Sequence, residues 1–235
     1  MEMIATNTVE LQAADGTTLS AYLAQPKDLT PSRSIIVFQE AFGVNAYIRD
    51  MTERLAREGF YAIAPDLFHR QGSNIEIPYT EFDRVRPLLA ALTIEGLEAD
   101  IRAAASWIQN EAKLELQPMH AIGFCMGGRV SFLANTILPL TSAVCFYGGG
   151  ISDLLDRANQ LHGSTLFFWG GKDPHISTEQ RGRITHALDE AGKSYTATVF
   201  SQADHGFFCD QRSSYHAKSA TLAWPLMVGF LKQEA

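Results

Sequence analysis

A cysteine between glycines is the first feature of this sequence that could do chemistry. Cys125 lies in the run Gly123-Phe124-Cys125-Met126-Gly127-Gly128, with an apolar run before it and a helical pattern after it. This is the layout of a nucleophile elbow, a sharp strand-to-helix turn with a strained nucleophile, here with cysteine in the serine position. The flanking glycines remove Cβ atoms that would collide in such a turn. The run alone leaves a second interpretation open, a buried structural cysteine in a tight turn.

An acid and a histidine follow Cys125 in the chain, each after a strand-like segment. Asp173 follows the apolar segment 165–169, and His205 follows the β-prone segment 195–200. The order nucleophile, acid, histidine is that of α/β-hydrolases. Sites in open α/β sheets form at the carboxyl ends of strands, so we predict that these three side chains meet. Two simpler interpretations remain, a turn opened by Asp173 and an ordinary loop histidine at position 205.

These residue types suit acyl transfer. A thiolate attacks an acyl carbon, and a histidine takes the thiol proton and then donates it to the leaving group. A carboxylate fixes the tautomer of the histidine and stabilises its cation. Backbone amides stabilise the oxyanion, and we expect them from Met126 and from Ala41, in the loop after an early strand. A thiolate is a better leaving group than an amine, so the tetrahedral adduct of a peptide would tend to expel the thiolate and revert. The chemistry therefore favours activated esters and lactones over peptides.

The elements that must position these residues alternate between strands and helices. Apolar or β-prone runs predict strands at 35–38, 60–64, 119–124, 142–147, 165–169 and 195–200. Helical patterns predict helices at 46–58, 93–111, 127–138 and 151–159. A further helix is expected to begin after an N-cap at Ser177 and to end at 191. The last predicted helix is 215–231, where Pro225 should bend or interrupt it. Segments 8–13 and 18–24, joined through Asp15-Gly16, predict a hairpin. Residues 67–87 have weak periodicity and are interpreted as an excursion over the site.

This alternation predicts an α/β fold. We expect a mostly parallel central sheet with helices on both faces and an N-terminal antiparallel hairpin at one edge. The sequence has 235 residues and no repeat, low-complexity tract or linker. One domain over residues 1–235 is therefore the simplest prediction.

Composition argues against several classes of partner and site. The formal net charge of −7 argues against nucleic acid or an anionic membrane as partner. No apolar run reaches the roughly 18 residues that span a bilayer, and residues 1–12 lack the basic region of a secretory signal. Three cysteines without tight pairing favour a reducing cytoplasm. Cys145 is expected in the core, and Cys209 is expected to be structural, with contact to substrate left open. The spacing of His and Cys gives no metal-ligand pattern.

Several pieces of the chain together resemble the dienelactone hydrolase (carboxymethylenebutenolidase) family, within the α/β-hydrolase superfamily. They span nearly the whole chain: Gln39-Glu40-Ala41-Phe42-Gly43-Val44-Asn45, Ala64-Pro65-Asp66-Leu67-Phe68, Gly123-Phe124-Cys125-Met126-Gly127-Gly128, Phe146-Tyr147-Gly148, Gly170-Gly171-Lys172-Asp173 and Asp204-His205-Gly206-Phe207. The resemblance implies an α/β-hydrolase fold and a cytoplasmic enzyme without a cofactor, acting on a small lactone or ester. It also implies a monomer, and a dimer stays open.

The resemblance also implies roles for single residues. It makes Cys125, Asp173 and His205 a catalytic triad. Glu40 matches the family glutamate that contacts the resting thiol, although it could be an ordinary polar residue at a strand end. Tyr147 matches a pocket tyrosine.

The residues expected to bind substrate match the family less well. In dienelactone hydrolases two arginines hold the substrate carboxylate; Arg84 lies near the expected place of one, although it could be a solvated helix charge. Where the family has an arginine four residues after the histidine, this chain has Cys209, and Arg212 three positions later could substitute. Phe42, within the first matching piece, is also assigned to the pocket.

The sequence thus predicts a cysteine-dependent hydrolase of small lactones or activated esters that acts through a thioester acyl-enzyme. Three alternatives remain. One is a general carboxylesterase of unrelated acyl groups, and another is a non-catalytic binding or sensor protein on the same fold. The third is a redox-sensing thiol, for which Cys209 would have to approach Cys125 through folding.

Overall fold

The structure, a computed structural model, describes residues 3–27, 31–111 and 118–233. Residue contacts group the chain into two compact units, residues 1–119 and 120–235, and each unit is described by itself. The described residues form eight strands, mostly parallel, with helices between them in the chain. The predicted α/β class is confirmed, whereas the single domain stays a prediction.

The strands of the first unit include the predicted hairpin. Its two strands pair antiparallel with Leu11 opposite Leu19, and the Asp15 carboxylate accepts a hydrogen bond from the Thr17 amide at 3.0 Å in the turn. The second hairpin strand also pairs antiparallel with β4, and β4 pairs parallel with β3. The bounds are β1 (Ile4–Gln12), β2 (Thr18–Pro26), β3 (Ser34–Phe38) and β4 (Tyr61–Pro65). Both β3 and β4 are buried throughout, as continuous apolar runs predict.

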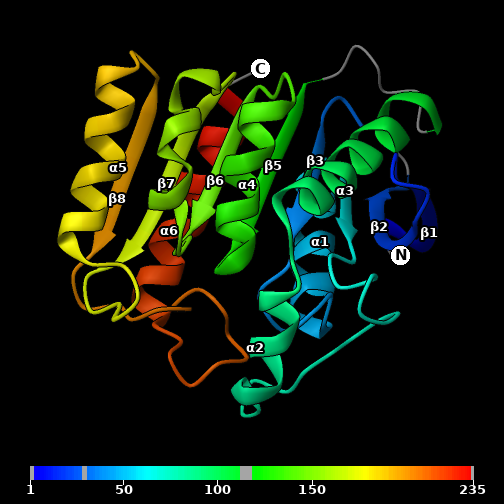
Figure 1. Ribbon diagram of the computed structural model, residues 1–235, viewed down its shortest axis with the longest axis horizontal. Helices are drawn as coiled ribbons and strands as arrows, with labels where there is room; N and C mark the ends of the chain where they lie inside the picture. The colour runs from blue at the N-terminus through cyan, green and yellow to red at the C-terminus, as the bar shows by residue number, and fades with distance from the viewer. Residues whose placement is uncertain (1–2, 28–30, 112–117, 234–235) are drawn as a thin grey trace. The chain divides into compact units, whose positions relative to one another are not determined.

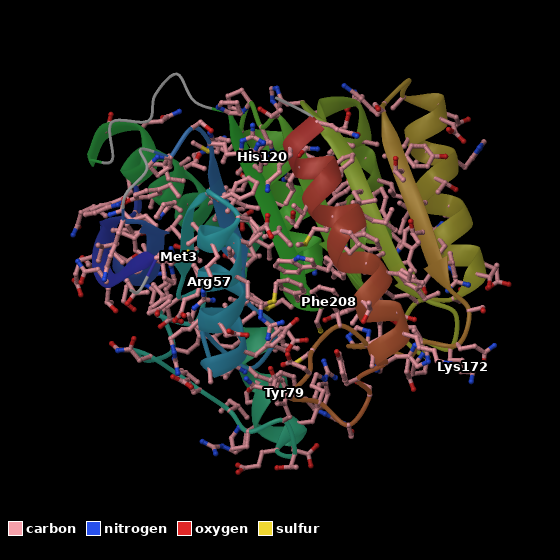
Figure 2. The ribbon with its side chains drawn as sticks, turned by 180° about the vertical axis from the view of Figure 1, so that it is seen from behind. Met3, Arg57, Tyr79, His120, Lys172 and Phe208 are labelled. Atoms are coloured by element: carbon pink, nitrogen blue, oxygen red, sulfur yellow. The ribbon has the colours of Figure 1, made fainter. Side chains whose placement is uncertain are left out.

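Two helices cover the strands of the first unit. Helix α1 (Ala46–Arg57) packs against β2 and β4, and α3 (Ile94–Ser106) packs against β4 and β1. Figures 1 and 2, taken from opposite sides, show that α1 and α3 lie on opposite faces of these strands. The helix predicted as far as residue 111 changes at its end to a π-helix, Trp107–Glu111.

A helix falls where the sequence predicted an irregular excursion. Helix α2 (Phe82–Ala90) occupies the end of the segment 67–87 and continues past it. The prediction failed here because the helix has almost no apolar stripe: of its residues, all described, Val85 alone is buried. Pro87 lies inside the helix, where proline normally argues against one.

The four strands among the described residues of the second unit are parallel and lie in the order β5-β6-β7-β8. Phe124, Phe146 and Phe168 stand opposite one another on the first three, with ring centroids 5.1 and 4.5 Å apart. The bounds are β5 (Met119–Phe124), β6 (Ser142–Phe146), β7 (Ser164–Gly170) and β8 (Tyr195–Phe200). This register brings the carboxyl ends of the strands to one edge.

Helices cover both faces of the second unit. Helices α4 (Met126–Ile137) and α5 (Thr178–Glu190) lie on one face, and α6 (Ala217–Gln233) lies on the other (Figures 1 and 2). The helical prediction after β6 is met by a 3₁₀ helix, Ile151–Gln160. The predicted cap of α5 is a full capping box, in which the Ser177 hydroxyl and the Gln180 side chain bond each other's amides. Pro225 lies within α6 and does not end it.

The described helices include none that is both long and apolar enough to cross a membrane.

Figure 2 shows Lys172 and Phe208 at one end of the second unit and His120, near the start of β5, at the other. The candidate residues of this unit therefore gather at the carboxyl ends of its strands.

Candidate active site

Cys125 occupies a strained turn between β5 and α4. Its backbone has φ 55° and ψ −118°, in the left-handed half of the map that non-glycine residues seldom adopt. Such a conformation costs on the order of 1–3 kcal/mol. The Cys125 amide donates to the Phe146 carbonyl and its own carbonyl accepts from the Gly128 amide, each at 3.0 Å. A Cβ atom at Gly123 would lie 1.8 Å from the Gly127 carbonyl oxygen, so the turn requires glycine there.

His205 and Asp173 form a buried hydrogen-bonded pair. His205 Nδ1 lies 2.8 Å from Asp173 Oδ2, and the two side chains are 10% and 0% exposed. The His205 ring also hydrogen-bonds with Cys125. The other carboxylate oxygen of Asp173 accepts a hydrogen bond from the His175 amide at 2.8 Å. The second unit therefore brings together, within itself, the three residues that the sequence singled out.

The surroundings of His205 favour its protonated form. Burial by itself lowers the pKa of the imidazole, because it penalises the cation. The hydrogen bonds with Asp173 and Cys125 and the negative charges of these partners outweigh burial and raise the pKa of His205 to about 10. An imidazolium at this position can stabilise a thiolate beside it.

Cys145 differs from Cys125 in its environment. It is fully buried on β6, and burial raises the pKa of its thiol far above the usual range, against a smaller lowering by the neighbouring Ser131 hydroxyl. Cys145 therefore remains a neutral thiol, and its predicted place in the core is confirmed. Cys209 is also fully buried and forms no disulfide.

Aromatic rings from two loops contact the His205 imidazole. Tyr147 follows β6, has φ 37° and is fully buried, and its ring centroid lies 5.1 Å from that of His205. His175 follows β7, is exposed, and lies edge to face with His205, at 5.0 Å and 87°. His175 was not predicted from the sequence, although a signal existed: an aspartate commonly accepts a hydrogen bond from the amide two residues after it.

Two further candidates lie close in the chain to Cys125 and His205. Met126 opens α4, and the first amides of a helix have no acceptor within the helix. Arg212 is half-buried, and its guanidinium packs on Gly206, where a Cβ atom would lie 2.6 Å from Arg212 Cζ. The roles of Met126 as an oxyanion donor and of Arg212 as a substrate ligand stay predictions.

The candidates of the first unit follow β3 or lie on α2. Glu40, Ala41 and Phe42 are all buried, and the Phe42 ring packs edge on against Tyr79 with centroids 4.6 Å apart. Arg84 is 60% exposed on α2 and pairs with Glu81, Nη1 to Oε2, at 2.6 Å. These surroundings suit the solvated helix charge that the sequence left open for Arg84. The described residues contain no cluster of three or more His, Cys, Asp or Glu side chains that could hold a metal.

Known proteins are similar to this chain in both fold and sequence. A crystal structure from Klebsiella pneumoniae subsp. pneumoniae, whose name places it among the dienelactone hydrolases, matches with a TM-score of 0.84 and 33% identity, covering 97% of this chain and 99% of that one. The fold is thus the α/β-hydrolase fold in its dienelactone hydrolase form.

Sequence relatives agree with this match. The profile of the dienelactone hydrolase family matches residues 19–235. A Pseudomonas putida protein named carboxymethylenebutenolidase is 30% identical over 233 residues, 96% of each chain. A Synechocystis protein whose name assigns it to the carboxymethylenebutenolidases is 33% identical over 216 residues, 88% of each chain. The chain belongs to the dienelactone hydrolase family.

Proposed function

We propose that this protein is a cysteine-dependent hydrolase of small lactones or activated esters, and that the acyl group passes through a thioester on Cys125. One observation carries the proposal: a cysteine on a strained turn hydrogen-bonds with a buried histidine, which is bonded in turn to a buried aspartate. Membership of the dienelactone hydrolase family supports an ester or lactone substrate.

Acylation begins with the transfer of the Cys125 proton to His205. The hydrogen bond between Cys125 and His205 supports this transfer, and Asp173 stabilises the cation that forms. The thiolate attacks the acyl carbon, and the Met126 amide, with Ala41 as the second donor, stabilises the oxyanion. His205 donates its proton to the departing enolate or alkoxide, which leaves the thioester on Cys125.

Deacylation reverses the role of His205. It takes a proton from water, the hydroxide adds to the thioester carbon, and the tetrahedral adduct expels the thiolate. The product is a carboxylic acid. In a lactone the leaving oxygen stays attached to the acyl group, so one open-chain product leaves the enzyme.

We also propose that Glu40 keeps the resting thiol protonated until substrate arrives. A nearby carboxylate raises a thiol's pKa because two negative charges repel. A neutral thiol resists oxidation, which would protect the nucleophile between turnovers. The burial of Glu40 two residues after the end of β3, and its match to the family glutamate, support this role.

The test is a screen of lactones and aryl esters with the native protein and three variants. Cys125→Ala should abolish hydrolysis, whereas Cys145→Ala and Cys209→Ala, matched controls at the other free cysteines, should retain most of it. Hydrolysis by purified Cys125→Ala at the native rate would exclude this cysteine as the nucleophile. A preference for unrelated acyl esters over lactones would indicate a general carboxylesterase instead.

A further inference from the structure

His175 contacts the Asp173–His205 pair through both its backbone and its ring. Its amide donates to Asp173 Oδ1 at 2.8 Å, while Asp173 Oδ2 lies 2.8 Å from His205 Nδ1. Its ring stands edge to face with the His205 ring at 5.0 Å between centroids. One residue thus contacts both the carboxylate and the imidazole.

The two contacts depend on different parts of the residue. Any residue except proline would supply the amide, because the bond to an aspartate two positions earlier is a common turn. Only a ring at position 175 can supply the second contact. His175 is exposed, so the hydrophobic core does not require an aromatic side chain there.

The His205 ring needs such a contact because it serves two partners at once. It bonds Asp173 through Nδ1 and also hydrogen-bonds with Cys125, so both bonds require the same ring plane. The ring torsion of histidine is broad rather than confined to sharp wells, so the neighbours must set the plane. Tyr147 contacts the ring from the loop after β6, and His175 contacts it from the loop after β7. Edge-to-face contacts of this kind are favourable and directional.

We propose that the ring of His175 is a positioning group that holds the His205 imidazole in the plane shared by Asp173 and Cys125. Its kinetic part rests on the proposed function, since it concerns the rate of acyl transfer. It predicts that ring shape at position 175 matters and that the ring nitrogens do not. His175 makes no chemical contribution of its own to the reaction.

The test compares three variants. His175→Ala keeps the amide and removes the ring, whereas His175→Phe keeps both a ring and the amide. His186→Ala is the matched control, because His186 is a similarly exposed histidine of the same unit, paired with Glu190 on α5. His175→Ala should lower kcat about three- to tenfold with little change in KM, and His175→Phe should restore most of it, in keeping with the strength of one aromatic contact. The control should match the native enzyme.

A second measurement needs no substrate. The Nδ1 proton of His205, observed by NMR, should exchange faster with water in His175→Ala and return to native behaviour in His175→Phe. The pH dependence of Cys125 alkylation by iodoacetamide should likewise change in His175→Ala and return to the native profile in His175→Phe. These readouts remain valid even if the native protein hydrolyses none of the esters, so failure of the proposed function and failure of this inference are distinguishable.

Three outcomes would overturn the proposal. Native kcat and a native Nδ1 signal in His175→Ala would show that the ring does not position His205. A change in KM alone would make His175 a substrate contact. Equal losses in His175→Ala and His175→Phe would assign the effect to the ring nitrogens.

Discussion

At the residue scale, His205 contacts candidate residues of the second unit through both hydrogen bonds and ring contacts. Its ring bonds Asp173 and Cys125 and contacts Tyr147 and His175, although its side chain is only 10% exposed. A buried cation is stable only with such partners. Removing a partner should therefore change the protonation of His205 before it changes the fold.

Asp173→Asn should lower the pKa of His205 from about 10 toward its ordinary value of 6.5. The pKa is higher in the folded protein than in the unfolded chain, so the native bond stabilises the fold fully below about pH 6.5. That stabilisation is lost as the pH rises toward about 10. Urea unfolding should show native protein more stable than Asp173→Asn at the lower pH, with the difference shrinking at the higher one. A difference independent of pH would contradict this assignment.

Glu40→Gln should expose the thiol of Cys125. Removal of one negative charge lets the thiolate form at lower pH. Alkylation of Cys125 by a small neutral reagent should then be faster at neutral pH, with its midpoint shifted downward, while hydrolysis becomes slower. Glu76→Gln, which removes one partner of an exposed ion pair, serves as the charge control. Alkylation profiles of Glu40→Gln identical to those of the native protein would leave Glu40 a structural residue.

At the scale of elements, the turn from β5 to α4 depends on the absence of side chains. Gly123→Ala would place a Cβ atom 1.8 Å from the Gly127 carbonyl oxygen, whereas Gly182→Ala on α5 meets nothing within 4 Å. Gly123→Ala should cost roughly 1–3 kcal/mol or more of unfolding free energy and most activity. Gly182→Ala should be neutral or stabilise by up to about 1 kcal/mol. Urea unfolding and ester hydrolysis measure both, and equal stability of the two variants would refute the steric argument.

The sequence predicted the elements that carry strong local signals. The hairpin at Asp15, the elbow at Cys125 and the capping box at Ser177 were all recognisable, because each depends on residue types at fixed short spacing. Helix α2 was missed because it buries only Val85 among its residues, all of them described, so no periodic stripe marks it. His175 was missed because its contact with His205 joins loops after β7 and β8, which only the parallel pairing of these strands brings together.

At the scale of the whole molecule, charge limits which substrates approach. The chain carries a formal net charge of −7, which repels anionic substrates, so an anionic lactone would need a local cation. Arg212→Ala should raise KM about tenfold for anionic lactones and little for neutral esters, since a charged hydrogen bond contributes roughly 1.5–3 kcal/mol. Arg84→Ala, which removes one partner of an exposed ion pair, should raise KM for anionic lactones less than Arg212→Ala does. An equal response of both substrate classes to both substitutions would exclude carboxylate recognition by these arginines.

The proposed mechanism requires that Cys125 carry the acyl group during turnover. Native protein should be mixed with an activated aryl ester, quenched with acid within the first turnovers, digested and measured by mass spectrometry. If Cys125 is the nucleophile, one acyl group should appear on the peptide that contains Cys125 and none on those with Cys145 or Cys209, and the label should be lost when the quench is delayed. Rapid hydrolysis with no acylated Cys125 at any quench time, or acylation of a different residue during turnover, would contradict it.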